Sequence, residues 1–169
     1  MKQKVRLFIS YAQRASGAAE SFCAAFEEYC ACSRSYDYAF WRDVDLLPGE
    51  KWEAVIMDQL SRCDGGLLLI SPSFLNSAYI SRVEMPALMR PDKVLIPVGL
   101  LKINLERHDL RGLKERQIYS LKPKGGGEAR YWDQLGKRAR ADFIDGLFTA
   151  LEKRLDKRRA MEPANHDEA

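Results

Sequence analysis

Short apolar segments alternate with stretches of helical periodicity along this chain, and this alternation constrains the fold more than any other feature. The run Gly65–Ile70 is apolar at every position, as expected of a strand that is buried on both faces. Alternating strands and helices favour a parallel sheet covered by helices on both sides. The predicted strands are Val5–Tyr11, Tyr36–Trp41, Gly65–Ile70 and Lys93–Gly99, with Gln117–Leu121 as a fifth strand at the sheet edge. The pattern therefore predicts an α/β fold, a flavodoxin-like three-layer sandwich with a five-stranded parallel sheet.

Helices are predicted between these strands from apolar residues at three- and four-residue spacing. The predicted segments are Ala18–Cys32, Trp52–Cys63, a helix that carries Glu84 after the third strand, and a closing helix over residues 142–151. Pro86 lies inside the helix of Glu84 and predicts a kink or a short first segment there. Pro97 in the fourth strand predicts incomplete pairing.

Length and charge indicate one globular domain without an evident nucleic-acid surface. The 169 residues suit a single domain, which we assign to residues 1–155, followed by a polar tail over 156–169 that we expect to be disordered. The 27 Lys and Arg are interspersed with 24 Asp and Glu, so no concentrated basic face is predicted for nucleic acid.

No apolar run approaches the roughly 20 residues that span a membrane. The first strand follows the N-terminus directly, without a signal region, and we therefore expect a cytoplasmic protein that engages no membrane.

The sequence lacks several motifs that α/β folds often carry. None of the four cysteines forms a Cys-x-x-Cys pair and both histidines are distant from them, so no metal site is predicted. Cys23 and Cys30 share a helical face and are predicted to be buried thiols. No Gly-x-Gly-x-x-Gly fingerprint follows the first strand, and no Lys-Ser/Thr follows the glycines at 125–127. These absences argue against dinucleotide-dependent dehydrogenases and P-loop enzymes.

Glu84 is the most informative candidate for chemistry. Its helix follows the buried third strand through the Ser71-Pro72 pair, which places the first turns at the carboxyl edge of the sheet. Open α/β sheets bind their ligands at that edge. A carboxylate there can meet a cationic or cation-forming substrate. By residue type alone, a solvated helix glutamate is the better explanation.

The order of four segments resembles that of a TIR (Toll/interleukin-1 receptor) domain, and the resemblance covers most of residues 5–155. Phe8–Tyr11 is similar to the first-strand box of that family, and Phe40–Trp52 to its second strand and the following "BB" loop. Leu69–Glu84 is similar to the third strand and active-site helix of bacterial members. Val94–Val98 matches the fourth strand.

The resemblance implies NAD⁺ glycohydrolase or cyclase chemistry with Glu84 as the catalytic carboxylate. NAD⁺ is then the substrate, and no cofactor is expected. Cleaving the nicotinamide–ribose bond develops an oxocarbenium-like cation, which a nearby carboxylate stabilises. Nicotinamide leaves as a neutral ring, so one carboxylate can suffice where ordinary glycosidases use two.

Five further residues are predicted to bind the substrate by the same resemblance. Trp52 stands where family members carry an aromatic that stacks on the substrate ring, although a core anchor is an equal alternative. Asp43 is expected to face the same cleft, or to cap its own loop. Tyr11 and Arg14 follow the first strand and could meet the ribose or phosphates, with a solvated arginine as the alternative for Arg14. The last predicted contact is Ser81, one turn before Glu84, at the family's small polar position. The chain departs from the family pattern where many relatives carry a tryptophan, because Ile80 occupies that place.

Two functions remain open from the sequence. The first is an enzyme of bacterial antiphage signalling that consumes NAD⁺, active through TIR–TIR self-association and working with a partner defence protein. The second is a TIR scaffold that pairs with other TIR domains without catalysis. The exposed apolar loop Leu46–Gly49 favours an interaction surface, whereas the glutamate at position 84 favours the enzyme.

Overall fold

A four-stranded parallel sheet forms the centre of the computed structural model, which describes residues 1–42 and 49–162. The strand order is β2-β1-β3-β4. The strands are β1 (Gln3–Ser10), β2 (Tyr36–Trp41), β3 (Gly65–Ile70) and β4 (Val94–Gly99). Every residue of β3 and β4 is buried, as predicted for strands that are covered on both faces.

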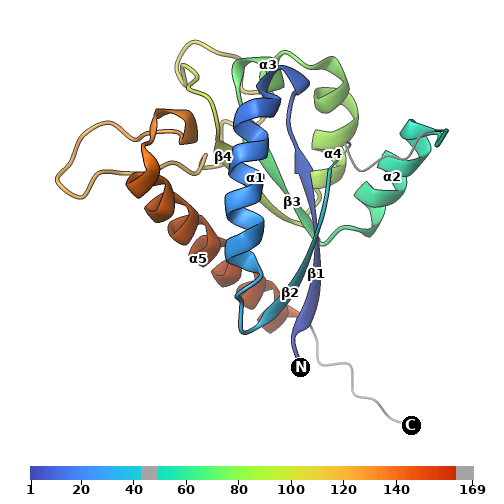
Figure 1. Ribbon diagram of the computed structural model, residues 1–169. Helices are drawn as coiled ribbons and strands as arrows, with labels where there is room; N and C mark the ends of the chain where they lie inside the picture. The colour runs from blue at the N-terminus through green and yellow to red at the C-terminus, as the bar shows by residue number, and fades with distance from the viewer. Residues whose placement is uncertain (43–48, 163–169) are drawn as a thin grey trace, which may run out of the picture.

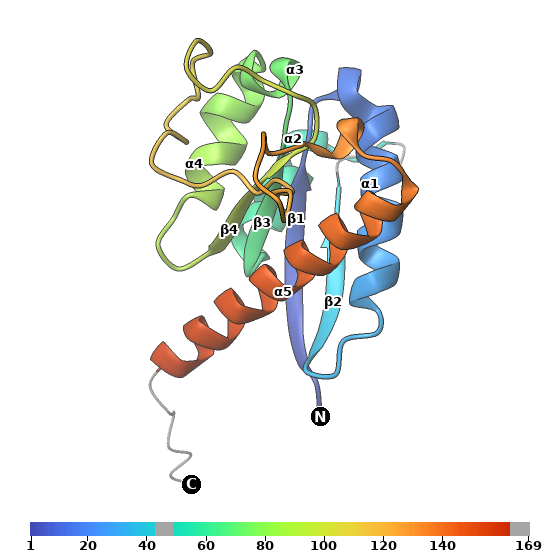
Figure 2. The same cartoon turned by 90° about the vertical axis from the view of Figure 1, so that its left-hand side faces the viewer.

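Helices cover both faces of the sheet and produce the three layers that the sequence predicts. Helices α1 (Ser16–Cys30) and α5 (Lys137–Met161) lie on one face, and α2 (Trp52–Arg62) and α4 (Met85–Leu88) lie on the other (Figures 1 and 2). The described structure also contains the short helical turns η1 (Gln13–Ala15), α3 (Pro72–Leu75) and η4 (Trp132–Gln134). The π-helical turn η3 (Ile80–Glu84) leads directly into α4.

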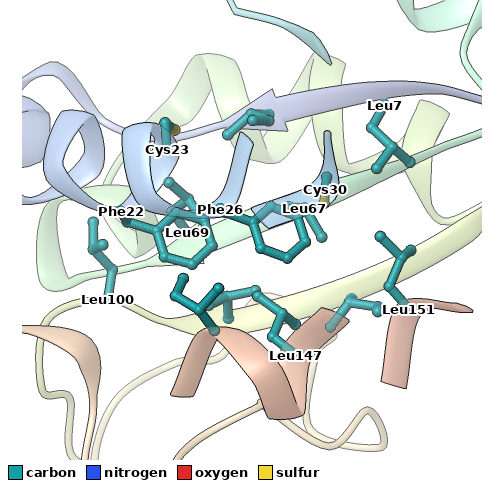
Figure 3. Close-up of a cluster of buried hydrophobic side chains, with 14 of the residues drawn as sticks. Leu7, Phe22, Cys23, Phe26, Cys30, Leu67, Leu69, Leu100, Leu147 and Leu151 are labelled. Atoms are coloured by element: carbon teal, nitrogen blue, oxygen red, sulfur yellow. The ribbon is translucent and has the colours of Figure 1, made fainter. Parts of the chain in front are cut away.

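Strand β1 divides its side chains between two hydrophobic cores. Leu7 and Ile9 pack beneath α1 and α5, whereas Phe8 packs toward α2 and α4. This division follows from the two-residue period of a strand. The first core is built from one face of each helix, and Figure 3 shows Phe22 and Phe26 of α1 with Leu147 and other side chains of that core.

The predicted buried thiols are confirmed. Cys23 and Cys30 are both free and 1% exposed on the inner face of α1. Burial raises the pKa of each thiol to about 12, because the thiolate would lose its hydration. Cys32, by contrast, is exposed.

The prediction of a fifth full strand is wrong for the described residues. Tyr119 forms an isolated parallel bridge with Val98, through Tyr119 N–H to the Pro97 carbonyl and Gly99 N–H to the Tyr119 carbonyl, both 2.8 Å. Pro97 has no amide hydrogen to donate, so this pairing does not continue along β4. The sheet therefore has four strands and one bridged edge segment.

Helix α5 continues past the predicted domain boundary at residue 155. Leu155 is buried, and Arg158 Nη1 donates to the Asp64 carbonyl at 3.0 Å, which holds the following turn against the body of the protein. The helix ends at Met161. Within residues 1–42 and 49–162, none of the helices has both the length and the apolar character needed to cross a bilayer.

Candidate active site at the carboxyl edge of the sheet

The carboxyl ends of β1 and β3 meet at a topological switch point. From β1 the chain crosses to β2 on one side of the sheet, and from β3 it crosses to β4 on the other. The strands β1 and β3 are themselves hydrogen-bonded neighbours. Leu7 lies opposite Gly65 at one end of the pairing, and Ser10 lies opposite Leu68 at the other. Open α/β sheets bind ligands in the crevice outside such a point, so the fold alone predicts a ligand site at this edge.

A cavity of about 780 Å³ lies at this edge. One wall comes from the segment after β1, including Gln13 and Arg14, and the facing wall comes from the segment after β3, including Ser73 and Asn76. Of the residues predicted to bind substrate, Arg14 lines this cavity, and it is exposed to solvent. Its guanidinium is therefore available to an anionic group in the crevice.

The segment after β3 is fixed by a side-chain cap. The Ser71 hydroxyl accepts a hydrogen bond from the Phe74 amide at 3.0 Å, and Pro72 begins the short helix α3. A serine cap followed by proline is a strong helix-start signal. As Figure 1 shows, α3 lies at the end of the molecule toward which β1 runs, opposite the N-terminus.

Glu84 is buried rather than solvated. It is 6% exposed, and the hydroxyl of Ser10, at the end of β1, donates a hydrogen bond to Oε2 of its carboxylate. Ser10 itself is 2% exposed. Burying a carboxylate is costly unless hydrogen bonds replace its hydration, so this contact argues against a solvated helix glutamate. It also places the carboxylate beside the end of β1, where the switch point lies.

The backbone around Glu84 departs from α-helical geometry. Residues Ile80–Glu84 form a π-helical turn in which the Met85 amide donates to the Ile80 carbonyl, five residues back. Pro86 follows in the first turn of α4 and has no amide hydrogen for an α-helical bond to Arg82. The predicted break at Pro86 is thus present as a change of helix type. Single π turns occur frequently at functional sites.

Trp52 lies against the segment that carries Glu84. Its ring meets that of Tyr79 edge to face, with centroids 5.3 Å apart, and Tyr79 is the residue immediately before η3. Trp52 remains 53% exposed, which a core anchor would not be. One face of this indole is therefore available to a partner or ligand.

The other predicted contacts take different positions. Ser81 is half-buried within η3, where its amide donates to the Ser77 carbonyl at 3.1 Å. Tyr11 is 5% exposed and belongs to the core beneath α1 and α5. Asp43 lies outside the described residues. The structure thus brings Trp52 and Ser81 to the Glu84 segment, and Arg14 to the crevice.

Sequence reasoning missed two residues of this arrangement, Ser10 and Tyr79. Ser10 lies inside the Phe8–Tyr11 box, and the period of the strand turns it away from the face of Leu7 and Ile9. Ser10 therefore points to the face of the sheet that α2 and α4 cover, and this alternation could have indicated a partner on that face. In the described part of the chain, no group of three or more His, Cys, Asp or Glu residues is arranged to hold a metal ion.

The arrangement consists of one buried carboxylate, an arginine-lined crevice and an exposed indole, all placed by a parallel sheet. A comparison with protein families matches residues 7–135 to the TIR domain. A comparison with curated proteins gives no significant match. The family match covers β1 from Leu7 onward, the other three strands of the sheet and Glu84, and the chain therefore belongs to the TIR domain family.

Proposed function

We propose that this TIR domain cleaves NAD⁺, releasing nicotinamide and either ADP-ribose or a cyclic isomer of it. The observation that carries the proposal is the buried Glu84 carboxylate, held by the Ser10 hydroxyl next to the switch point of the sheet. A scaffold has no need to bury an acidic side chain at this edge, because the burial brings a desolvation cost.

The proposed chemistry needs a single carboxylate. The bond between the ribose C1′ and the nicotinamide nitrogen breaks, and its electron pair leaves with the ring, which becomes neutral. The positive charge passes to the ribose as an oxocarbenium-like centre, and Glu84 stabilises that charge electrostatically. Water then adds to C1′ and loses a proton, giving ADP-ribose. Attack by a nucleophile of the adenine ring gives the cyclic isomer instead.

The remaining residues supply binding. The Arg14 guanidinium lines the crevice and can pair with the pyrophosphate, which carries the negative charge of the substrate. The exposed Trp52 ring can stack on a substrate ring. Asp43 and Ser81 keep the roles proposed from the family resemblance, whereas Tyr11 is buried in the core beneath α1 and α5 and is not carried into the proposal.

Self-association is part of the proposal, because the family resemblance implies a pocket that a neighbouring copy completes. We expect the rate per protein molecule to rise with protein concentration. The proposed setting is cytoplasmic antiphage signalling with a partner defence protein.

Nicotinamide release by concentrated protein tests the proposal, with Glu84→Ala as the inactive variant and Glu106→Ala as the matched control. Glu106 is exposed in the loop after β4, so its loss removes one acid without altering the site. We expect turnover by the wild type and by Glu106→Ala, and none by Glu84→Ala. Absence of turnover at every concentration, together with TIR–TIR pairing that survives Glu84→Ala, would favour the scaffold.

A further inference from the structure

A second cavity, of about 580 Å³, opens at the far edge of the sheet beside β4. It lies between the middle of β4, residues 116–122 and the helix α5, and none of its lining residues lines the crevice at the switch point. Its volume falls within the range of small-molecule sites, roughly 300–1,000 Å³. The bridged segment around Tyr119 forms one wall of this edge cavity.

The edge cavity is basic. Three of its lining residues are cations, Arg116, Lys122 and Arg154, and none is acidic. Across residues 1–42 and 49–162, none of these three side chains forms a salt bridge.

Backbone carbonyls hold two of the cations in place. Arg154 Nη1 donates to the Leu95 carbonyl at 2.5 Å, and Arg116 Nη2 donates to the Met89 carbonyl at 3.4 Å. Each guanidinium has five N–H donors, so most of them stay available. A guanidinium that is held in place in this way can bind two oxygens of one phosphate group at once.

The two guanidinium groups also repel each other. Burial lowers the pKa of Arg154, and the positive charge of Arg116 lowers it further. The negative charge of an anion between the two side chains would offset both effects. The same cavity exposes apolar surface from residues such as Pro97, Ile118 and Ala150, which can cover the uncharged part of a ligand.

From these contacts we propose that the edge cavity binds a small organic phosphate, with Arg116, Arg154 and Lys122 on the phosphate groups and the apolar lining against the organic body. A nucleoside diphosphate has the required charge and size. This site is independent of the proposed NAD⁺ chemistry, because it uses other residues at another edge of the sheet.

Calorimetric titration of the full chain with ADP tests this proposal, with inorganic pyrophosphate and adenosine as partial probes. We expect ADP to bind the wild type, and the double variant Arg116→Ala/Arg154→Ala to bind it more weakly by about tenfold or more. Adenosine, which lacks phosphate, should bind much more weakly than ADP. Pyrophosphate should bind, but less tightly than ADP.

The control removes two equivalent charges elsewhere. Arg107→Ala/Arg159→Ala takes one arginine from the loop after β4 and one from α5, both exposed and outside the cavity. This double variant should bind ADP as the wild type does. Equal weakening in both double variants would overturn the proposal, because it would show only a response to net charge.

A second pair of variants avoids any loss of folding. Lys122 and Lys124 are both exposed, and only Lys122 lines the cavity. Lys122→Glu should weaken ADP binding, whereas Lys124→Glu should leave it nearly unchanged. The proposal fails if ADP does not bind the wild type at millimolar concentration, or if Lys122→Glu and the arginine variant bind it normally. ADP binding that these variants retain would belong to the switch-point crevice.

Discussion

At the scale of single residues, the contact between Ser10 and Glu84 connects the fold to the proposed chemistry. The two residues are 74 positions apart, and both are buried. A charge-assisted hydrogen bond orients the carboxylate and replaces part of its lost hydration. Glu84 thereby keeps a defined position at the edge of the sheet. We regard Ser10 as a positioning residue, since it acts on substrate only through Glu84.

Removing the Ser10 hydroxyl should lower the stability of the protein. Ser10→Ala leaves a buried carboxylate with one donor fewer, and we expect the free energy of unfolding to fall by about 1–3 kcal/mol. Urea unfolding measures this change, and Ser61→Ala, at an exposed hydroxyl, should change it by less than about 0.5 kcal/mol. In the Glu84→Ala background the cost of Ser10→Ala should shrink. An unchanged cost there would show that the two side chains are not energetically coupled.

At the scale of secondary-structure elements, two local devices shape the site and the sheet that carries it. One is the π-helical turn η3, which sets the rotation of Glu84 about its helix axis. The other lies at the opposite end of the sheet, where the close approach of β3 and β4 holds together the two strands. An alanine Cβ at Gly65 would overlap the Val94 carbonyl oxygen. We expect the π turn to depend on Pro86 and the close approach of the strands to depend on Gly65.

Pro86→Ala should lower activity more than stability. The new amide hydrogen can bond to the Arg82 carbonyl in α-helical register, which would turn Glu84 away from Ser10. We expect the rate of nicotinamide release to fall by about tenfold or more, since small displacements of catalytic groups have large effects. Urea unfolding run in parallel should show little loss. Full activity in this variant would show that the π turn is not needed.

Gly65→Ala should destabilise the protein, whereas Gly17→Ala should not. The first change forces β4 away from β3 and should lower the free energy of unfolding by about 1–3 kcal/mol. Gly17 lies in α1, where an added Cβ would meet no atom within 4 Å, so alanine there should raise stability by about 0.4–1 kcal/mol. Thermal unfolding of the two variants gives opposite shifts if this account of the sheet is correct.

At the scale of the whole molecule, α5 ties the two edges of the sheet together. Tyr36 on β2 donates to Asp156 Oδ1 on α5 at 2.5 Å. Arg154 of the same helix donates to the Leu95 carbonyl of β4, and Arg158 donates to the Asp64 carbonyl just before β3. The helix therefore spans the sheet from β2 to β4, which Figure 2 shows as a diagonal crossing.

The hydrogen bond from Tyr36 to Asp156 should be lost at alkaline pH. Burial raises the pKa of Tyr36 to about 12, with a further contribution from its hydrogen bond to Asp156. The unfolded chain gives up this proton near pH 10. The free energy of unfolding should therefore fall as the pH rises from about 10 to 12, whereas below that window the contribution of this group should be fully present and independent of pH.

Tyr36→Phe is the control for this prediction. The wild type should be more stable than the variant at neutral pH, because it has the additional hydrogen bond. That advantage should shrink as the pH passes 10, as followed by urea unfolding at each pH. A constant difference between the two proteins across this range would contradict the account.

The sequence predicted those features that depend on neighbouring residues. The bounds of β2 follow from a β-prone aromatic run, those of β3 follow from an apolar run with clear ends, and the break near Glu84 follows from Pro86. Contacts between distant segments could not be predicted in the same way. The Ser10–Glu84 hydrogen bond depends on the register of β1 against β3. The reduction of the fifth strand to a bridge at Tyr119 likewise depends on which residues of β4 lie opposite that segment, because Pro97 cannot donate to it.

The most direct test of the central claim is the rate of nicotinamide release from NAD⁺ by Glu84→Gln beside the wild type. Glutamine preserves the size of the side chain and can still accept a hydrogen bond from Ser10, so the change removes little besides the charge. The account predicts a rate lower by about a hundredfold or more, with unfolding behaviour close to that of the wild type. Equal rates in the two proteins would show that the Glu84 charge does not carry the reaction.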